Sequence, residues 1–192
     1  MLLQKLLGEF EIKDRVFTAE EEKLFDSFFE YRPVKKNTFL IREGEIETYS
    51  YFVYSGILRC WILDQHGVEQ TFWFCKEGTF SMSNISLTLG ERATFNVQTL
   101  VDCEIYCIKK EEIGALYAAI PALTPLFENL TARLLDRLLH RQVALIKYSP
   151  EEYYVELRST FGAAIHSIPL KDIASFLGIT PQALSRIRKR IF

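Results

Sequence analysis

Residues 34–109 follow a pattern that differs from the rest of the chain. Short runs rich in Phe, Tyr, Val, Ile and Thr alternate with period two, and Gly44, Gly56, Gly67 and Gly78 interrupt them. Alternation with period two predicts β-strands, and regular glycine turns between short strands predict a sandwich or barrel. Residues 64–67 are predicted to form the hairpin turn between strands at 58–63 and 68–74.

Helical patterns precede this region. Leu2 to Phe10 suits an amphipathic helix, and Thr18 to Glu21 is a capping box that starts a second helix. We expect Arg32-Pro33 to end that second helix, because the residue before a proline disfavours helical geometry.

A long helix is predicted after the strands, from about residue 126 to residue 147. Leucines at three-, four- and seven-residue spacings form its apolar stripe, and Leu135 and Leu139 widen this stripe beyond one face. We therefore expect burial against two surfaces, the second of them on another subunit. A helix that packs only on its own β-region is the alternative.

Residues 169–190 have the pattern of two short helices joined by a tight turn. Gly178 allows the first helix to stop with positive φ, and Thr180-Pro181 supplies an N-cap and a first helical residue that needs no amide hydrogen. Two such helices, the second with a polar and basic outer face, indicate a helix-turn-helix that places its second helix in the major groove of DNA. An ordinary helical hairpin with a solvated face is the alternative.

Side chains on the second helix and at its cap are the predicted DNA contacts: Thr180, Gln182, Ser185, Arg186, Arg188 and Lys189. Glutamine suits adenine and arginine suits guanine, so Gln182, Ser185 and Arg186 are assigned to base edges. The other three are assigned to phosphates.

The length of 192 residues suits one medium domain and one small domain. The net charge of −2 does not suggest a nucleic-acid ligand, but basic residues concentrate at the C-terminus. No apolar run is long enough to span a bilayer and no signal peptide is recognisable, so we expect a cytoplasmic protein without a membrane partner. The cysteines show no CxxC spacing and are expected to be small buried hydrophobes rather than metal ligands: Cys60, Cys75, Cys103 and Cys107.

The β-region, together with the C-terminal motif, resembles the Crp/Fnr family of transcription regulators. Residues 38–45 (TFLIREGE), 51–59 (YFVYSGILR) and 184–187 (LSRI) carry this resemblance. It implies an α+β chain of two domains: a jelly-roll sensor of the cyclic-nucleotide-binding type at 1–147, with a dimerisation helix at about 121–147, and a helix-turn-helix domain at 148–192. Only two residues follow Arg190, so we expect a DNA-binding domain without the β-hairpin wing of other members.

The resemblance also implies partners: a second copy of the chain, double-stranded DNA with a pseudo-palindromic operator, and RNA polymerase. The region around residues 148–152 is the expected hinge between sensor and DNA-binding domain. A protein-binding or cyclic-nucleotide-binding signalling module that does not bind DNA is the alternative.

The nucleotide pocket departs from the family pattern. Arg92 falls where the phosphate-binding arginine belongs, but Ser81 replaces a glycine, Met82 replaces the ribose-binding carboxylate and Ala93 replaces a hydroxyl residue. Each lost charge-assisted hydrogen bond costs about 1.5–3 kcal/mol, so we do not expect cyclic AMP to bind. The candidate effector residues are Arg92, Ser81, Met82, Ser83 and Thr94, for an unidentified small molecule. A structural Arg92 paired with Glu91 or Asp102 is the alternative.

Other chemistries lack their residues. A metal-dependent enzyme of the cupin type needs several histidines and a carboxylate on neighbouring strands, and the β-region has only His66, in a turn. The first cysteine is Cys60, whereas an iron–sulfur sensor needs a cluster of cysteines near the N-terminus. We therefore expect neither an enzyme nor a metal cofactor.

Overall fold

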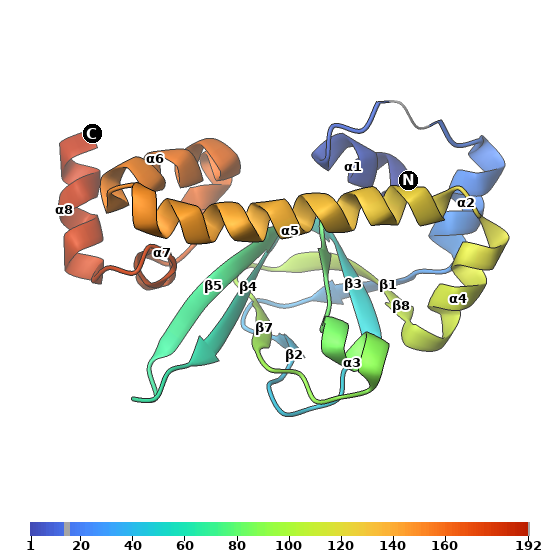
Figure 1. Ribbon diagram of the computed structural model, residues 1–192, viewed down its shortest axis with the longest axis horizontal. Coiled ribbons are helices and arrows are strands. Elements are labelled where there is room, and N and C mark those ends of the chain that lie inside the picture. Colours follow the sequence, from blue (N-terminus) through green and yellow to red (C-terminus); the bar gives the residue numbers. More distant parts are fainter. Residues whose placement is uncertain (14–15, 192) are drawn as a thin grey trace.

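The computed structural model describes residues 1–13 and 16–191. Two four-stranded antiparallel sheets form the β-region, with strand orders β1-β8-β3-β6 and β2-β7-β4-β5 (Figure 1). The strands are β1 (Glu30–Val34), β2 (Phe39–Ile41), β3 (Tyr49–Ser55), β4 (Ile57–Leu63), β5 (Glu69–Lys76), β6 (Phe80–Ser81), β7 (Asn96–Thr99) and β8 (Cys103–Lys109). The predicted all-β region is confirmed.

The inward-facing side chains of both sheets form one apolar core. Val53 and Ile105 of the first sheet pack with Leu58 and Val97 of the second, and each is at most 1% exposed. Gly56, between β3 and β4, has a φ of +105°, and a Cβ there would lie 2.4 Å from the Sγ of Cys103. The turn therefore requires glycine, for conformation and for space.

Helices lie at both ends of the β-region and along one side of it (Figure 1). They are α1 (Leu2–Glu9), α2 (Ala19–Ser27), α3 (Asn84–Leu89), α4 (Lys110–Ala119), α5 (Leu123–Lys147), α6 (Pro150–Phe161), α7 (Leu170–Phe176) and α8 (Pro181–Ile191). The long α5 runs past the sheets and connects the end that carries α1, α2 and α4 to the end that carries α6–α8. This arrangement places the helix-turn-helix beside the β-region.

One local prediction is wrong. The second helix ends at Ser27 and not at Arg32-Pro33, because residues 30–34 form β1; Pro33 is tolerated there since β1 is an edge strand. A short 3₁₀ helix, Gly162–Ser167, connects α6 to the segment before α7. The long helix spans Leu123–Lys147, so it begins between the two expected starts near residues 121 and 126. Pro125 lies in its first turn, where no backbone hydrogen bond is lost.

The C-terminal helices share a core with the β-region. Ile57, Phe74 and Leu100 pack with buried residues of α6, α7 and α8. The Phe74 ring centroid lies 5.3 Å from that of Phe176 in α7 and 6.0 Å from that of Phe161 in α6. The helical unit is thus docked against β5, an edge strand of the second sheet.

The segment between α5 and α6 has clear local signals. Ser149 caps α6: its hydroxyl accepts from the amide of Glu152, and the Glu152 carboxylate accepts from the Ser149 amide. α5 ends at Lys147. A boundary between two domains at residues 147 and 148 stays a prediction.

All four cysteines are buried, as expected, and the sulfur atoms of Cys60 and Cys75 lie 3.9 Å apart. No helix in residues 1–13 and 16–191 combines the length and apolarity needed to cross a membrane. The same residues contain no cluster of His, Cys, Asp and Glu suited to a metal ion.

Candidate DNA interface and effector cavity

The turn between α7 and α8 has the geometry that its sequence predicts. Gly178 adopts a φ of +68°, and the amide of Ile179 donates to the carbonyl of Ala174 across the turn. The Thr180 hydroxyl accepts from the amide of Ala183 at 3.2 Å, so it caps α8. Ala174 is fully buried where the two helices meet. A larger side chain at this position would force the helices apart.

The second helix, α8, has one buried face and one outer face. Leu184 and Ile187 are buried, whereas Gln182, Arg186 and Lys189 are exposed. Ser185 and Arg188, the other predicted contacts on this helix, are partly buried. The outer face is therefore free to approach a ligand, although none of these roles is tested by the geometry alone.

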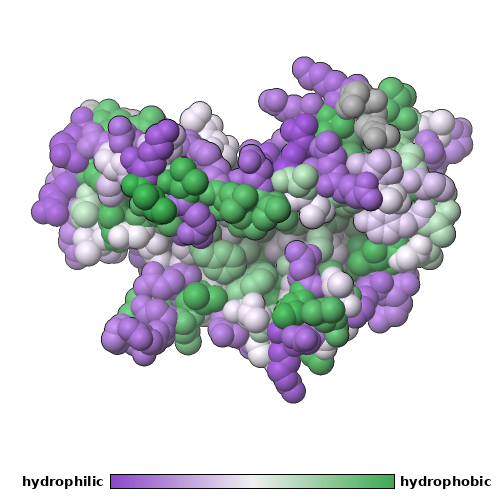
Figure 2. All heavy atoms as spheres, in the orientation of Figure 1, coloured by the Kyte–Doolittle hydropathy of each residue, from purple (hydrophilic) through white to green (hydrophobic). Residues whose placement is uncertain are grey.

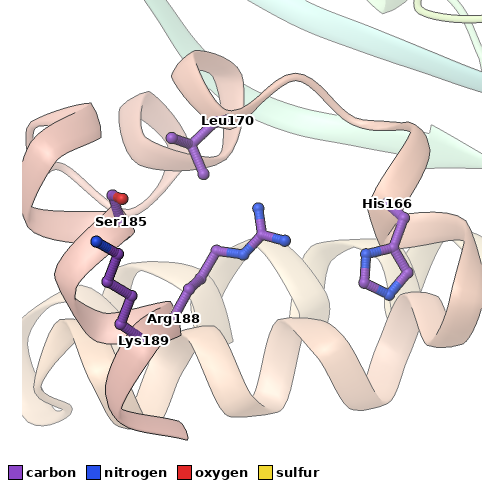
Figure 3. A pocket seen from close by; sticks show the side chains of 5 residues that line it. All are labelled: His166, Leu170, Ser185, Arg188 and Lys189. Carbon is purple, nitrogen blue, oxygen red and sulfur yellow. The ribbon is translucent and has the colours of Figure 1, made fainter. Parts of the chain in front are cut away.

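A hollow of about 610 Å³ lies beside α8, lined by His166, Leu170, Ser185, Arg188 and Lys189. Figure 3 shows the Arg188 guanidinium extending between α8 and the 3₁₀ helix that carries His166. Ser185 and Lys189 lie on the same side of α8 (Figure 3). His166 was not among the predicted site residues, because nothing in its local sequence indicates that the 3₁₀ helix lies next to α8.

The first helix of the motif, α7, is held against β5 by polar contacts. The Ser175 hydroxyl accepts from the amide of Thr71 at 2.8 Å. Arg59 of β4 reaches Asp172 of α7, with 3.3 Å between Nη1 and Oδ1, and also binds Glu69 at 2.6 Å. Burial raises the pKa of Asp172, and the charge of Arg59 offsets part of that rise. No sequence signal pointed to these residues.

The predicted effector residues separate into three places. Ser81, Met82 and Thr94 line a cavity of about 1120 Å³ between the β-region and α5. Ser83 is fully buried and caps α3, since its hydroxyl accepts from the amide of Ser86. Arg92 is exposed and donates to the carbonyl of Gly44 at 2.7 Å.

The side chain expected to hold a phosphate therefore does not line this cavity. Arg92 forms no ion pair with Glu91 or Asp102 among the described residues; Asp102 instead pairs with Lys35 at 2.8 Å. The structural role of Arg92 here is to bind a backbone carbonyl of the loop after β2. The five predicted effector residues stay predictions.

An apolar band covers the C-terminal half of α5. Large apolar side chains are exposed there in close succession: Leu134, Leu135, Leu138, Leu139, Val143, Leu145 and Ile146. Figure 2 shows this band as a green stripe across the face of the molecule that carries α5. We refer to these seven residues as the α5 stripe.

Comparisons with known proteins agree with this architecture. The family model described as the cyclic nucleotide-binding domain matches residues 31–119. FixK2 from Bradyrhizobium japonicum has a similar structure, with a TM-score of 0.72 and 18% identity, over 85% of this chain and 84% of that one. The regulator CLP from Xanthomonas campestris, which responds to c-di-GMP, is similar with a TM-score of 0.69 and 16% identity, over 91% of each chain.

A protein from Eubacterium rectale assigned to the Crp/Fnr family of transcriptional regulators has a TM-score of 0.67 and 18% identity, over 91% of this chain and 83% of that one. A search of curated proteins found no match by sequence. The fold and the comparisons thus define the class: a cyclic-nucleotide-binding β-domain joined to a C-terminal helical unit. Within that class, the chain has the fold of the Crp/Fnr transcription regulators, which confirms the resemblance identified from its sequence.

Proposed function

We propose that this protein is a homodimeric, DNA-binding transcription regulator of the Crp/Fnr type. The observation that carries the proposal is the exposed outer face of α8, where Gln182, Arg186 and Lys189 project from a helix-turn-helix. This helix buries Leu184 and Ile187 in the core and keeps its cations on the outer face. Such a helix suits insertion into the major groove. A regulator of this kind acts in the cytoplasm, where bacterial DNA lies.

The hollow beside α8 supports phosphate contacts. Arg188 and Lys189 supply two positive charges to it. A phosphate at this place would gain charge-assisted hydrogen bonds, and its position would fix how α8 lies in the groove. Ser185 is placed at the border between this hollow and the outer face, where it can serve either contact.

The α5 stripe supports dimerisation. Monomeric proteins rarely leave a contiguous apolar band of this kind in water, and α5 is long enough to form a two-helix seam with a second copy. A symmetric dimer carries two α8 helices, as binding to a pseudo-palindromic operator requires. RNA polymerase remains a proposed further partner.

The effector role is proposed in a form that differs from cyclic AMP binding. Met82 lines the cavity where a ribose-binding carboxylate would be needed, and Arg92 binds the Gly44 carbonyl instead of facing the cavity. Calorimetry with cyclic AMP and cyclic GMP is expected to show millimolar binding or none. Tight, stoichiometric binding of either nucleotide would contradict this part of the proposal.

The decisive experiment is selection of DNA from a random library with the purified full-length protein, followed by anisotropy titrations. We expect an enriched sequence with two inverted half-sites, and we expect Arg186→Ala to weaken binding to it by about tenfold or more. Arg42→Ala is the matched control, because it removes the same charge from the sensor, where Arg42 lies over the Phe39 ring. Absence of DNA binding at low salt would leave a protein-binding module as the better account.

A further inference from the structure

The large cavity extends well beyond the place of the predicted effector residues. It runs along α5 from the end of β6 to α6 and α7, so it touches both the β-region and the C-terminal helices. Leu134 and Arg141 both line it and are separated by two turns of α5. At a rise of about 1.5 Å per residue, that separation is about 10 Å.

Part of the cavity lining is apolar. Phe72 and Phe95 both line it and meet edge to face, with 5.3 Å between their ring centroids, and neither is fully buried. Met82, Ile85 and Leu134 also line the cavity. These side chains offer contact surface to a flat or branched apolar group, and they offer no charge to a nucleotide phosphate.

Basic side chains also line the cavity, and most of them already have a partner. Glu9 binds both Lys76, at 3.0 Å, and Arg137, at 3.4 Å. His140 lies 3.5 Å from Glu156. These groups therefore bring little free charge to the cavity.

Arg141 differs from these cations. No carboxylate among the described residues forms an ion pair with it. Its guanidinium donates to the carbonyl of Phe176 at 3.2 Å and lies 4.7 Å from the centroid of the Phe176 ring. Its Nε is shielded from solvent and has no hydrogen-bond partner within residues 1–13 and 16–191. Burial lowers the pKa of Arg141, because the charged form has lost contact with water.

We propose that this cavity binds an organic anion about 10 Å long, with its apolar body between Phe72, Phe95 and Leu134 and its carboxylate or sulfonate on Arg141. The anion supplies the missing counter-charge, and a guanidinium holds such a group in a bidentate manner. Arg92 does not line this cavity, so the proposed anion site does not use it.

Occupancy would also reach the helix-turn-helix. Arg141 donates to a carbonyl at the end of α7, so an anion on the guanidinium competes with that contact and alters how α7 is held. This regulatory step rests on the proposed DNA-binding function, whereas ligand binding itself does not.

The test uses two fluorescent probes of similar shape, anilinonaphthalene sulfonate and the neutral N-phenylnaphthylamine, with the full-length protein. We expect Arg141→Gln to weaken binding of the sulfonate by about tenfold or more and to change binding of the neutral probe by less than about twofold. Arg141→Lys should restore most of the sulfonate affinity. Arg133→Gln is the matched control, because Arg133 also lines the cavity but is exposed and bonded to Asn129.

Equal sulfonate binding by the wild type and Arg141→Gln would overturn the proposal, as would an equal loss in Arg133→Gln. If Arg141→Gln does not fold, a displacement titration of the wild-type protein tests the site. Phenylbutyrate should displace the neutral probe at about one tenth of the concentration that phenylbutyramide needs. Equal displacement by the two would overturn the site. DNA binding, measured separately by anisotropy with and without phenylbutyrate, would stand or fall independently of these results.

Discussion

Arg59 of β4 and Asp172 of α7 form a buried ion pair between the β-sandwich and the helix-turn-helix, with 3.3 Å between Nη1 and Oδ1. Their side chains are only 4% and 3% exposed. Arg59 also binds the carboxylate of Glu69 and the hydroxyl of Thr71. A buried pair of this kind adds little net stability because desolvation opposes attraction, but it fixes the position at which the two surfaces meet.

Removing one member of this pair should be costly. Arg59→Met leaves Asp172 buried without its counter-charge, and we expect the free energy of unfolding to fall by about 3 kcal/mol or more. Adding Asp172→Leu to that variant should restore much of the loss, because neither charge is then buried. Urea denaturation of the three proteins measures both effects.

The control for these variants is Lys35→Met, which breaks the exposed ion pair between Lys35 and Asp102. It should leave the denaturation midpoint unchanged, because such exposed pairs contribute little to stability. A double variant no more stable than Arg59→Met alone would contradict the account of the buried pair.

The same aspartate predicts a pH dependence. Burial raises the pKa of Asp172 above its ordinary value of 3.8, so the folded protein holds this proton more tightly than the unfolded chain does. The contribution of Asp172 to stability is therefore greatest at acid pH and declines as the pH rises from 3.8 through the raised folded pKa. Above that interval the contribution is constant.

Asp172→Asn removes the titrating carboxyl group and leaves the other ionisable groups in place. The free energy of unfolding of the wild type should therefore fall relative to that of Asp172→Asn as the pH rises through this interval. Urea denaturation of both proteins between about pH 3.5 and pH 7 measures it. A difference that moves in favour of the wild type with rising pH would show that the attraction of Arg59 outweighs burial.

Two residues of α8 should affect DNA binding in different ways. Lys189→Ala removes a proposed phosphate contact, so it should weaken binding to all sequences alike and reduce the salt-dependence slope by about 1. Gln182→Ala removes a proposed base contact, so it should reduce discrimination at one A·T position and leave the slope unchanged. Anisotropy titrations at several salt concentrations, with operator and mismatched DNA, separate these outcomes.

If Gln182→Ala weakens binding to matched and mismatched DNA equally, its assignment to a base edge is wrong.

The α5 stripe should control the oligomeric state. Leu135→Glu together with Leu139→Glu places two charges in the proposed seam, and we expect the dimer to dissociate into monomers in sedimentation experiments. Affinity for a two-half-site operator should fall steeply in this variant. Val155→Glu is the matched control, because Val155 is an exposed apolar residue of α6 outside the stripe. A variant that remains dimeric would place the interface elsewhere.

Local signals made the helix-turn-helix predictable. Gly178 at positive φ, the Thr180 cap and the buried Leu184 and Ile187 all depend on residues close together in the chain. The alternation of residues 34–109 likewise predicts strands, and the hairpin between β4 and β5 lies where its turn residues indicate. The end of the second helix was missed because Pro33 is compatible with an edge strand as well as with a helix terminus.

The residues that line the cavity could not be predicted from the family resemblance alone. The sequence placed Arg92 at the phosphate position, but its guanidinium donates to the Gly44 carbonyl. Arg141 gave no local signal, because its burial in the cavity and its contact with the Phe176 carbonyl depend on where α6 and α7 lie.

The sequence by itself determined which regions form helices and strands, which residues form the turns, and which face of α8 is polar. It could do so because propensity, capping and periodicity act over a few residues. Only the tertiary structure decided that Arg59 contacts Asp172, that His166 lies beside Arg188, and that no carboxylate within residues 1–13 and 16–191 pairs with Arg141. Those relationships come from docking α6–α8 against β5, and long-range packing and desolvation are set by the whole chain rather than by any stretch of it.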